Sequence, residues 1–172
     1  LLAAVIAEFG QYWMHRAAHT QGWLWTVHSM HHAPQRVSLA NGFRTNPLNM
    51  VWHQLAGLGV LMLMGTPEPV LQMLILLSMV LGVFQHANAA LRFDGWNWVL
   101  GTADLHRWHH AADATQARCN FGQNLVLWDQ LFGSYRRAQA GGPRAPAVVG
   151  IEGQPPAAGG YWAQVWRSTV GR

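Results

Sequence analysis

Long apolar runs alternate with short histidine-rich segments along the chain. The runs cover residues 1–14, 50–64 and 70–84, and their length and composition predict helices that are buried or embedded in a membrane. The last two runs are each shorter than the roughly 20 residues of an untilted span, so they predict either two tilted spans or a re-entrant helical hairpin. In both cases the chain returns to the side of the membrane that it left. His86 is therefore expected on the same side as the segments that follow the first run.

Shorter helices are predicted beside these runs. One begins after Gly22 and is stopped by Pro34, because proline cannot continue a helix interior. A polar loop follows at 35–47, and an amphipathic connection at 87–104 leads to a second histidine-rich helix. With one more helix expected at about 123–132, the pattern predicts an all-α fold in which membrane helices carry a helical cap.

Two units are expected along the chain. Residues 1–137 form the main domain, and we expect part of its N-terminal spanning helices to be missing because the sequence begins inside an apolar run. Residues 138–172 are rich in Ala, Gly and Pro without periodicity, which predicts a disordered tail. Tyr161, Trp162 and Trp166 near its end indicate either a weak interfacial anchor or a frayed terminus.

The charge pattern is typical of a membrane protein. Charged residues make up 10% of the 172 residues, against about a quarter in ordinary soluble domains. All eleven basic residues are arginine, and the formal net charge is +4. Most of these arginines share a side with the histidines, so the positive-inside rule makes the cap cytosolic. Because they are scattered among apolar and histidine-rich segments, they favour a cationic face on an anionic membrane over a nucleic-acid site.

Most of the ten histidines fall into three compact clusters. Residues 28–32 (H-S-M-H-H) and 106–110 (H-R-W-H-H) share the spacing i, i+3, i+4, and residues 15–19 (H-R-A-A-H) add an i, i+4 pair. On a helix these offsets place the imidazoles on one face, within reach of a common point. Neutral imidazole binds first-row transition metals well, so the clusters predict a site for two metals. A purely structural origin is a poor alternative, because buried histidines without partners are costly.

The shortage of carboxylates narrows the type of metal site. Soluble di-iron bundles use Glu residues and Glu-x-x-His pairs, but here Glu8 is the only carboxylate near the first two clusters. Nearly all ligands must then be neutral imidazoles, which suits a strongly positive site for dioxygen. A catalytic zinc takes only three protein ligands and a water, and the single Cys119 excludes a cysteine-based zinc motif. Eight or nine histidines fit two irons with open positions.

The order of these motifs resembles a known superfamily. After the apolar hairpin the chain reads F-Q-H-A-N, then H-R-W-H-H, N-F-G and W-D-Q-L-F-G. Together with the two earlier clusters, residues 8–137 resemble the fatty acid hydroxylase and sterol desaturase superfamily. The resemblance implies an integral membrane enzyme with a cytosol-facing, non-haem di-iron centre. Two departures, residues 44–47 (R-T-N-P) in place of R-x-H-P and Ser134 in place of a closing threonine, put the subfamily and the substrate in question rather than the ligands.

Carried over residue by residue, the resemblance implies nine iron ligands. They are His15, His19, His28, His31, His32, His86, His106, His109 and His110. Asn88, Asp104 and Asp129 are candidate hydrogen-bond partners of bound water or of imidazole N–H groups. For Asn88 a turn role is the better interpretation, and for Asp129 a capping or arginine-pairing role is an equal alternative. His53 is expected to be structural or interfacial, and Arg107 to face lipid headgroups or a redox partner.

The expected activity is hydroxylation of a C–H bond of a membrane lipid, either fatty acyl, sterol or another isoprenoid, with O2 and two electrons. Desaturation at the same site is one alternative, and a non-catalytic histidine-rich membrane protein that binds zinc or copper is another. No haem, flavin or nicotinamide motif is present in the sequence. Electrons are therefore expected from a cytochrome b5- or ferredoxin-like protein and its reductase. The expected location is the bacterial inner membrane, with the active site facing the cytoplasm.

Overall fold

The computed structural model describes residues 1–89, 93–139, 142–154 and 158–170. These residues are all-helical: they contain no β-strand, only isolated bridges between Leu100 and Leu125 and between Ala111 and Val149. The all-α prediction is confirmed. The α-helices are α1 Leu2–Ala18, α2 Gly22–His32, α3 Pro47–Gln54, α4 Val60–Leu63, α5 Glu68–Gln85, α6 Ala103–His109, α7 Ala114–Ala117, α8 Leu127–Leu131 and α9 Tyr161–Val170. A π-helix, η2 Leu55–Gly59, joins α3 to α4, and η1 Leu39–Phe43 and η3 Trp96–Trp98 are 3₁₀ turns.

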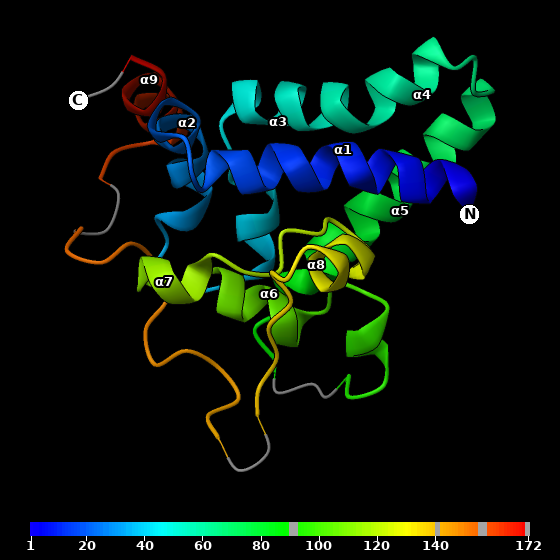
Figure 1. Ribbon diagram of the computed structural model, residues 1–172. Helices are drawn as coiled ribbons and strands as arrows, with labels where there is room; N and C mark the ends of the chain where they lie inside the picture. Colours follow the sequence, from blue (N-terminus) through cyan, green and yellow to red (C-terminus); the bar gives the residue numbers. More distant parts are fainter. Residues whose placement is uncertain (90–92, 140–141, 155–157, 171–172) are drawn as a thin grey trace.

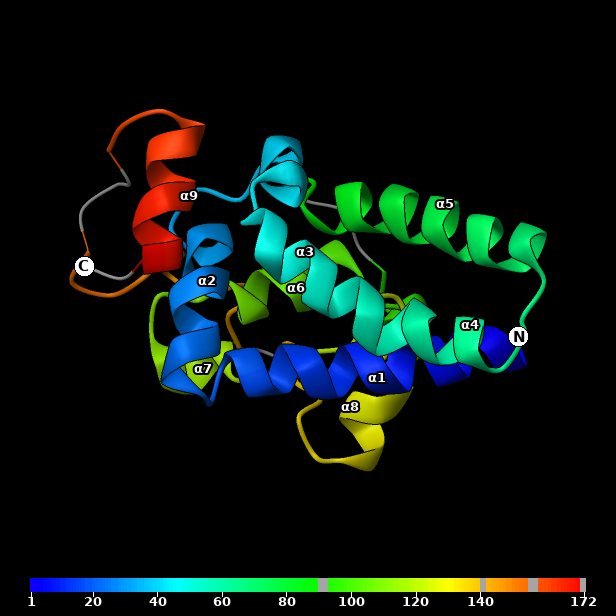
Figure 2. The same ribbon diagram turned by 90° about the horizontal axis from the view of Figure 1, so that it is seen from above.

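Three long helical stretches lie side by side (Figure 1). Seen from above, the continuous stretch α3–η2–α4 runs between α1 and α5 (Figure 2). The predicted pair of apolar helices is thus present as an antiparallel hairpin. Its turn lies at the same end of the molecule as the N-terminus, and α2 and α9 lie at the opposite end. Ala7, Leu61 and Leu74, one from each stretch, form the buried apolar cluster that holds them together.

Glycines let α1 and the π-helix approach each other closely. A Cβ atom at Gly10 would lie 1.8 Å from the carbonyl oxygen of Ala56, and one at Gly57 would lie 2.8 Å from the side chain of Gln11. Neither position therefore accepts a larger residue without moving its neighbours. This contact fixes the hairpin against the helix that leads directly into the first histidine pair.

The hairpin presents an apolar surface to its surroundings. Among the described residues, α5 alone is long and apolar enough to cross a membrane, with a mean hydropathy of 1.6 over 18 residues. Only 11% of that window is buried, and Met73, Leu76 and Val80 are each more than half exposed. Leu55 and Leu63 extend the exposed apolar surface over the first arm of the hairpin. Such a surface is unusual in a monomer in water and fits contact with lipid.

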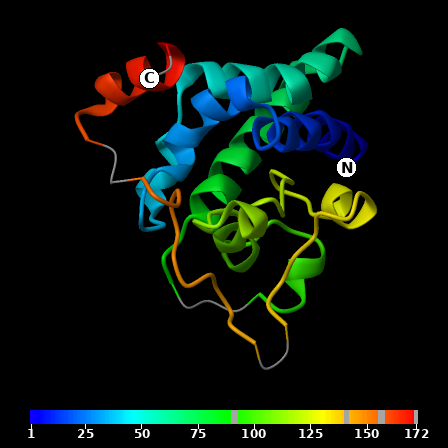
Figure 3. The ribbon, with the colours of Figure 1, turned by 60° about the vertical axis from the view of Figure 1, so that its left-hand side comes forward.

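The described part of the segment after residue 137, for which a disordered tail is predicted, contains α9. This helix lies beside α2 (Figure 3). The side-chain amide of Asn46 donates hydrogen bonds to the hydroxyls of Ser168 and Thr169 at 2.8 and 2.9 Å, and the Gly150 N–H donates to the His110 carbonyl at 3.1 Å. Its composition lacks periodicity, but these long-range contacts order the described part. The division of the chain into two units stays a prediction.

Candidate metal centre

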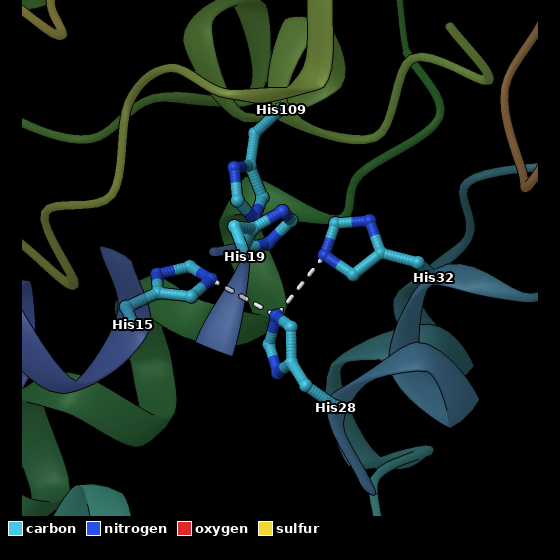
Figure 4. A group of neighbouring side chains, drawn as sticks. All are labelled: His15, His19, His28, His32 and His109. Carbon is cyan, nitrogen blue, oxygen red and sulfur yellow. Dashed lines mark hydrogen bonds between the residues drawn. The ribbon is translucent and has the colours of Figure 1, made fainter. Parts of the chain in front are cut away.

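The nine histidines expected as ligands converge into two groups of ring nitrogens. Within each group the ligand nitrogens all lie within 4.8 Å of one another. The five-histidine group consists of His15, His19, His28, His32 and His109 (Figure 4), and the four-histidine group of His31, His86, His106 and His110. Two nitrogens on opposite sides of one ion lie about 4.2 Å apart when each metal–nitrogen bond is about 2.1 Å. Each group therefore has the dimensions of one ion's ligand set.

Helix geometry explains how the clusters divide between the groups. In α2, His28 and His32 belong to the five-histidine group and His31 to the four-histidine group. In α6 the groups are exchanged: the i, i+4 pair joins the four-histidine group, and the i+3 residue, His109, joins the five-histidine group. At 3.6 residues per turn, i and i+4 point about 40° apart, but i+3 and i+4 diverge by about 100°. The expectation that each triplet surrounds one common point is therefore wrong, and each helix contributes to both groups.

Hydrogen bonds select the ring tautomer that binds metal. Backbone carbonyls lie 2.7–2.8 Å from the Nδ1 atoms of three histidines: Phe121 from His15, Gly82 from His86 and Cys119 from His109. A carbonyl only accepts, so Nδ1 carries the proton and Nε2 keeps its lone pair for the interior of the group. The buried Nε2 atoms of His19 and His109 have no hydrogen-bond partner within the described residues. A bound ion would satisfy both, so the residues present fit a metal.

Distances between neighbouring ligand atoms support the same conclusion. Five pairs of Nε2 atoms within the groups lie 3.0–3.3 Å apart. Ligands at right angles around one ion are separated by about 3 Å when the bonds are about 2.1 Å long. The imidazole nitrogens thus already have the spacing that ions would impose on them.

Burial keeps these imidazoles neutral. It lowers the pKa of each of the six histidines in the clusters at 28–32 and 106–110 below the ordinary value, and neighbouring histidines lower it further. For His109 the pKa falls to about 4, despite the hydrogen bond to the Cys119 carbonyl, which raises it. At neutral pH the lone pairs are therefore available to a metal without prior loss of a proton.

Asn49 makes a contact that the sequence analysis missed. Its Oδ1 lies 3.1 Å from Nδ1 of His28, and its Nδ2 donates to the Thr45 hydroxyl at 3.0 Å. With Oδ1 of Asn49 facing His28, Nδ1 of this histidine is also the protonated nitrogen. A signal was present in the sequence, because Asn49 stands directly before the apolar run at 50–64, four residues before His53.

Within the described residues, none of the three predicted hydrogen-bond partners makes a hydrogen bond to an imidazole. Asn88 is exposed. Asp104 instead accepts the Phe93 N–H at 3.3 Å, which ties α6 to the preceding connection. Arg107 donates to the Ala87 carbonyl at 3.3 Å on the same side of α6. These residues position the helix rather than its histidines.

Asp129 acts on the site indirectly, through the backbone of Phe121 and Gly122. It is fully buried and accepts the N–H groups of Phe121 and Gly122 at 2.7 and 2.8 Å, and the Ser134 hydroxyl at 2.7 Å. The segment that it holds carries the Phe121 carbonyl, which orients His15. Of the two roles expected for Asp129, capping of backbone N–H groups is the one that the structure supports.

Glu8 holds the next residues of the same segment. Its carboxylate is buried and accepts the N–H groups of Gln123, Asn124 and Leu125 at 2.9–3.3 Å. This turn occupies part of the predicted helix at 123–132, of which only α8 is helical. Glu8 is therefore engaged with backbone and belongs to neither group of metal-binding nitrogens.

We expect Asp129→Asn to destabilise the protein and to weaken the five-histidine group. An amide cannot accept at both positions, so one backbone N–H is left unpaired in the interior, at a cost of about 1–3 kcal/mol. The Phe121 carbonyl then no longer holds His15 firmly. Thermal unfolding in detergent and metal content per chain measure both effects. Asp94→Asn, on the exposed connection, is the matched control, and equal stability of the two variants would contradict the prediction.

Comparison with known proteins agrees with this geometry. The sequence model of the fatty acid hydroxylase family matches residues 1–134. The chain is 34% identical to the ornithine lipid hydroxylase OlsE of Rhizobium tropici over 166 residues, which cover 96% of this chain and 48% of that protein. It is 25% identical to the alkylglycerol monooxygenases of Xenopus tropicalis and Homo sapiens, over 74% of this chain and 28% of each relative.

The chain thus spans about half the length of the first of these relatives and less than a third of the other two. No solved structure matches it. The family match extends from the first apolar helix through all three histidine clusters to the end of the motif that contains Asp129. The chain belongs to the fatty acid hydroxylase family.

Proposed function

We propose that this protein is a membrane-bound di-iron oxygenase that hydroxylates a C–H bond of a lipid. In this reaction one atom of O2 enters the C–H bond, and the other leaves as water after taking up two electrons and two protons. The observation that carries the proposal is a pair of histidine groups that both border one cavity between apolar helices. Family membership and the names of the relatives support lipid hydroxylation.

The donor set suits iron and dioxygen. The five-histidine group would hold one ion and the four-histidine group the other. When bound, the two irons would supply the activation of dioxygen and the attack on the C–H bond. Because all the donors are neutral, the chain leaves the charge of the ions uncompensated, which favours binding of reduced, anionic forms of oxygen.

The cavity beside the groups is the proposed lipid site. It has a volume of about 270 Å³ and is bordered by His15 and His28 of one group and by three histidines of the other. The arms of the hairpin contribute its apolar wall: Met50 from α3, and Ile75, Met79 and Val83 from α5. A lipid could reach this space from the bilayer between the arms, while the cap excludes bulk water. The relatives' names indicate polar lipids, such as ornithine lipid or alkylglycerol, as the first substrates to test.

The surroundings of the site support a membrane enzyme. The exposed apolar surface of α5 would lie in the bilayer, and the arginine distribution favours a cap in the bacterial cytoplasm. Electrons would come from a cytochrome b5- or ferredoxin-like protein and its reductase, because the sequence carries no haem, flavin or nicotinamide motif that could supply them.

Lipid mass spectrometry of cells with and without the full-length gene tests the proposal. The expected result is a lipid that gains one oxygen atom only in cells that carry the gene. Loss of two hydrogens instead would establish a desaturase. Iron analysis with Mössbauer spectroscopy of the purified protein should find two coupled irons per chain. Zinc or copper in both groups, with an unchanged lipid profile, would identify a non-catalytic metal-binding protein.

A further inference from the structure

Nine of the ten histidines belong to the two groups, and His53 is the one that belongs to neither. The structure places it beside the five-histidine group, with its ring centroid 5.3 Å from that of His15 and 5.9 Å from that of His28. It lies one helical turn after Asn49 on α3, so both side chains point to the same region. His53 also borders the cavity proposed for the lipid.

The ring nitrogen of His53 is buried but unused. Its Nε2 has no hydrogen-bond partner within the described residues, and a buried polar atom without a partner costs free energy. The ring packs against the imidazoles of His15 and His28, whose Nε2 atoms face each other and whose Nδ1 atoms face the Phe121 carbonyl and the Asn49 side chain. The free nitrogen is therefore available to a molecule that enters the cavity.

The cavity is more polar than a hydrocarbon chain requires. Besides histidines it is bordered by uncharged hydrogen-bonding side chains from several parts of the fold: Gln11, Asn49, Gln54, Ser78, Gln85 and Gln123. Asn49, Ser78 and Gln85 already make hydrogen bonds within the protein. The side-chain amides of Gln11, Gln54 and Gln123 make none with the described residues. A methylene chain beside these amides would leave their polar atoms unpaired, which a binding site penalises strongly. About 270 Å³ holds only part of a lipid. The part of the lipid that enters should therefore carry hydrogen-bonding atoms.

We propose that His53 is a specificity-determining residue, whose Nε2 makes a hydrogen bond to a polar atom of the lipid next to the carbon that is hydroxylated. The inference rests on the proposed function and specifies which part of the substrate reaches the metals. Since His53 contacts two rings of the five-histidine group, an atom bound to it is held beside that group. The reacting carbon then lies near the polar region of the lipid, not in the middle of an acyl chain.

The test compares lipid binding by the full-length protein loaded with zinc, which binds imidazole but does not turn over. Native mass spectrometry would count bound ornithine lipid and 1-O-hexadecylglycerol, and hexadecane as a probe without polar atoms. His53→Phe keeps a planar ring but no ring nitrogen, His53→Gln keeps a hydrogen-bonding group, and Trp52→Phe, whose ring contacts Trp23 on the outside of α3, is the matched control.

We expect His53→Phe to weaken binding of at least one polar lipid by roughly tenfold, as loss of one hydrogen bond would, and to leave hexadecane binding unchanged. His53→Gln should restore most of the affinity, and all variants should keep two zinc ions per chain. Loss of one ion in both His53 variants would make His53 a metal ligand and overturn the proposal. Unchanged binding, equal weakening of all three probes, or a wild type that binds no polar lipid would also overturn it.

A failure of the proposed function can be distinguished from a failure of the His53 inference. If zinc-loaded protein binds polar lipid through His53, but the iron-loaded protein forms no hydroxylated product with an electron donor, only the oxygenase proposal fails. With the iron-loaded enzyme, the position of the new hydroxyl is a second measure of the His53 contact. His53→Phe should spread hydroxylation over several carbons, and a single unchanged position would count against the inference.

Discussion

Replacing His109 by alanine should abolish hydroxylation while the protein stays in the membrane. His109 is fully buried at the centre of the five-histidine group, with its ring centroid 4.4 Å from that of His15, 4.6 Å from that of His19 and 4.7 Å from that of His32. Without this imidazole, water competes for the open position, and the group binds its ion more weakly. Turnover should fall on the order of 10³-fold or more, since each ion stabilises the transition state by several kcal/mol.

Metal analysis separates this result from simple unfolding. His109→Ala should bind the ion of the five-histidine group more weakly, so that a chelator removes this ion first. His106→Ala should weaken the ion of the four-histidine group instead. Asp94→Asn, on the exposed connection before α6, is the control and should keep both ions and full turnover. If His109→Ala retained two ions and normal turnover, the assignment of the five-histidine group as a metal site would be wrong.

The histidines could be identified from the sequence because each cluster is a local feature. Spacing of i, i+3 and i+4, or of i and i+4 alone, specifies a set of neighbouring side chains wherever a helix forms, and three such sets in one domain would be costly to bury without a metal. Their division into five and four was not predictable in the same way. Whether the i+3 residue shares an ion with its neighbours depends on where the next helix places its own nitrogens, which is a tertiary property.

The contacts around the histidines were harder to predict for the same reason. Carbonyl groups of the chain orient three imidazoles, and any residue type can supply a carbonyl. Asp129 is a candidate from the sequence, but its effect reaches His15 only through the backbone at Phe121. Sequence composition does not encode such indirect connections.

The contacts of the segment after residue 137 were not predictable from its own composition. Its ordering depends on Asn46, which stands in the R-T-N-P element that departs from the superfamily pattern. Asn46 accepts the Leu48 N–H at the start of α3 and donates to two hydroxyls of α9, more than 120 residues away. The departure from the family motif therefore has a structural role, because it connects α3, the helix that carries Asn49 and His53, to α9.

Removing both metals should leave a protein that unfolds readily in mild acid. In the unfolded chain each histidine binds a proton with a pKa near 6.5, whereas burial lowers the pKa of His109 in the folded protein to about 4. Between these values the unfolded state binds more protons, so folding stability that is present above pH 6.5 is lost as the pH falls. One such histidine accounts for about 3 kcal/mol over this interval, at about 1.4 kcal/mol per unit of pKa shift.

Several buried imidazoles act together, and typical domains are stable by only about 5–15 kcal/mol. The metal-free protein should therefore lose its helical circular dichroism signal between about pH 6.5 and 4. With metal bound, protons must first displace the ions, so the transition should move to lower pH. Acid titration of chelator-treated and metal-loaded protein in the same detergent measures the shift. If the two transitions coincided, the nine imidazoles would hold no metal that stabilises the fold. If the metal-free protein were equally stable at pH 7 and pH 4, the imidazoles would not be buried as neutral groups.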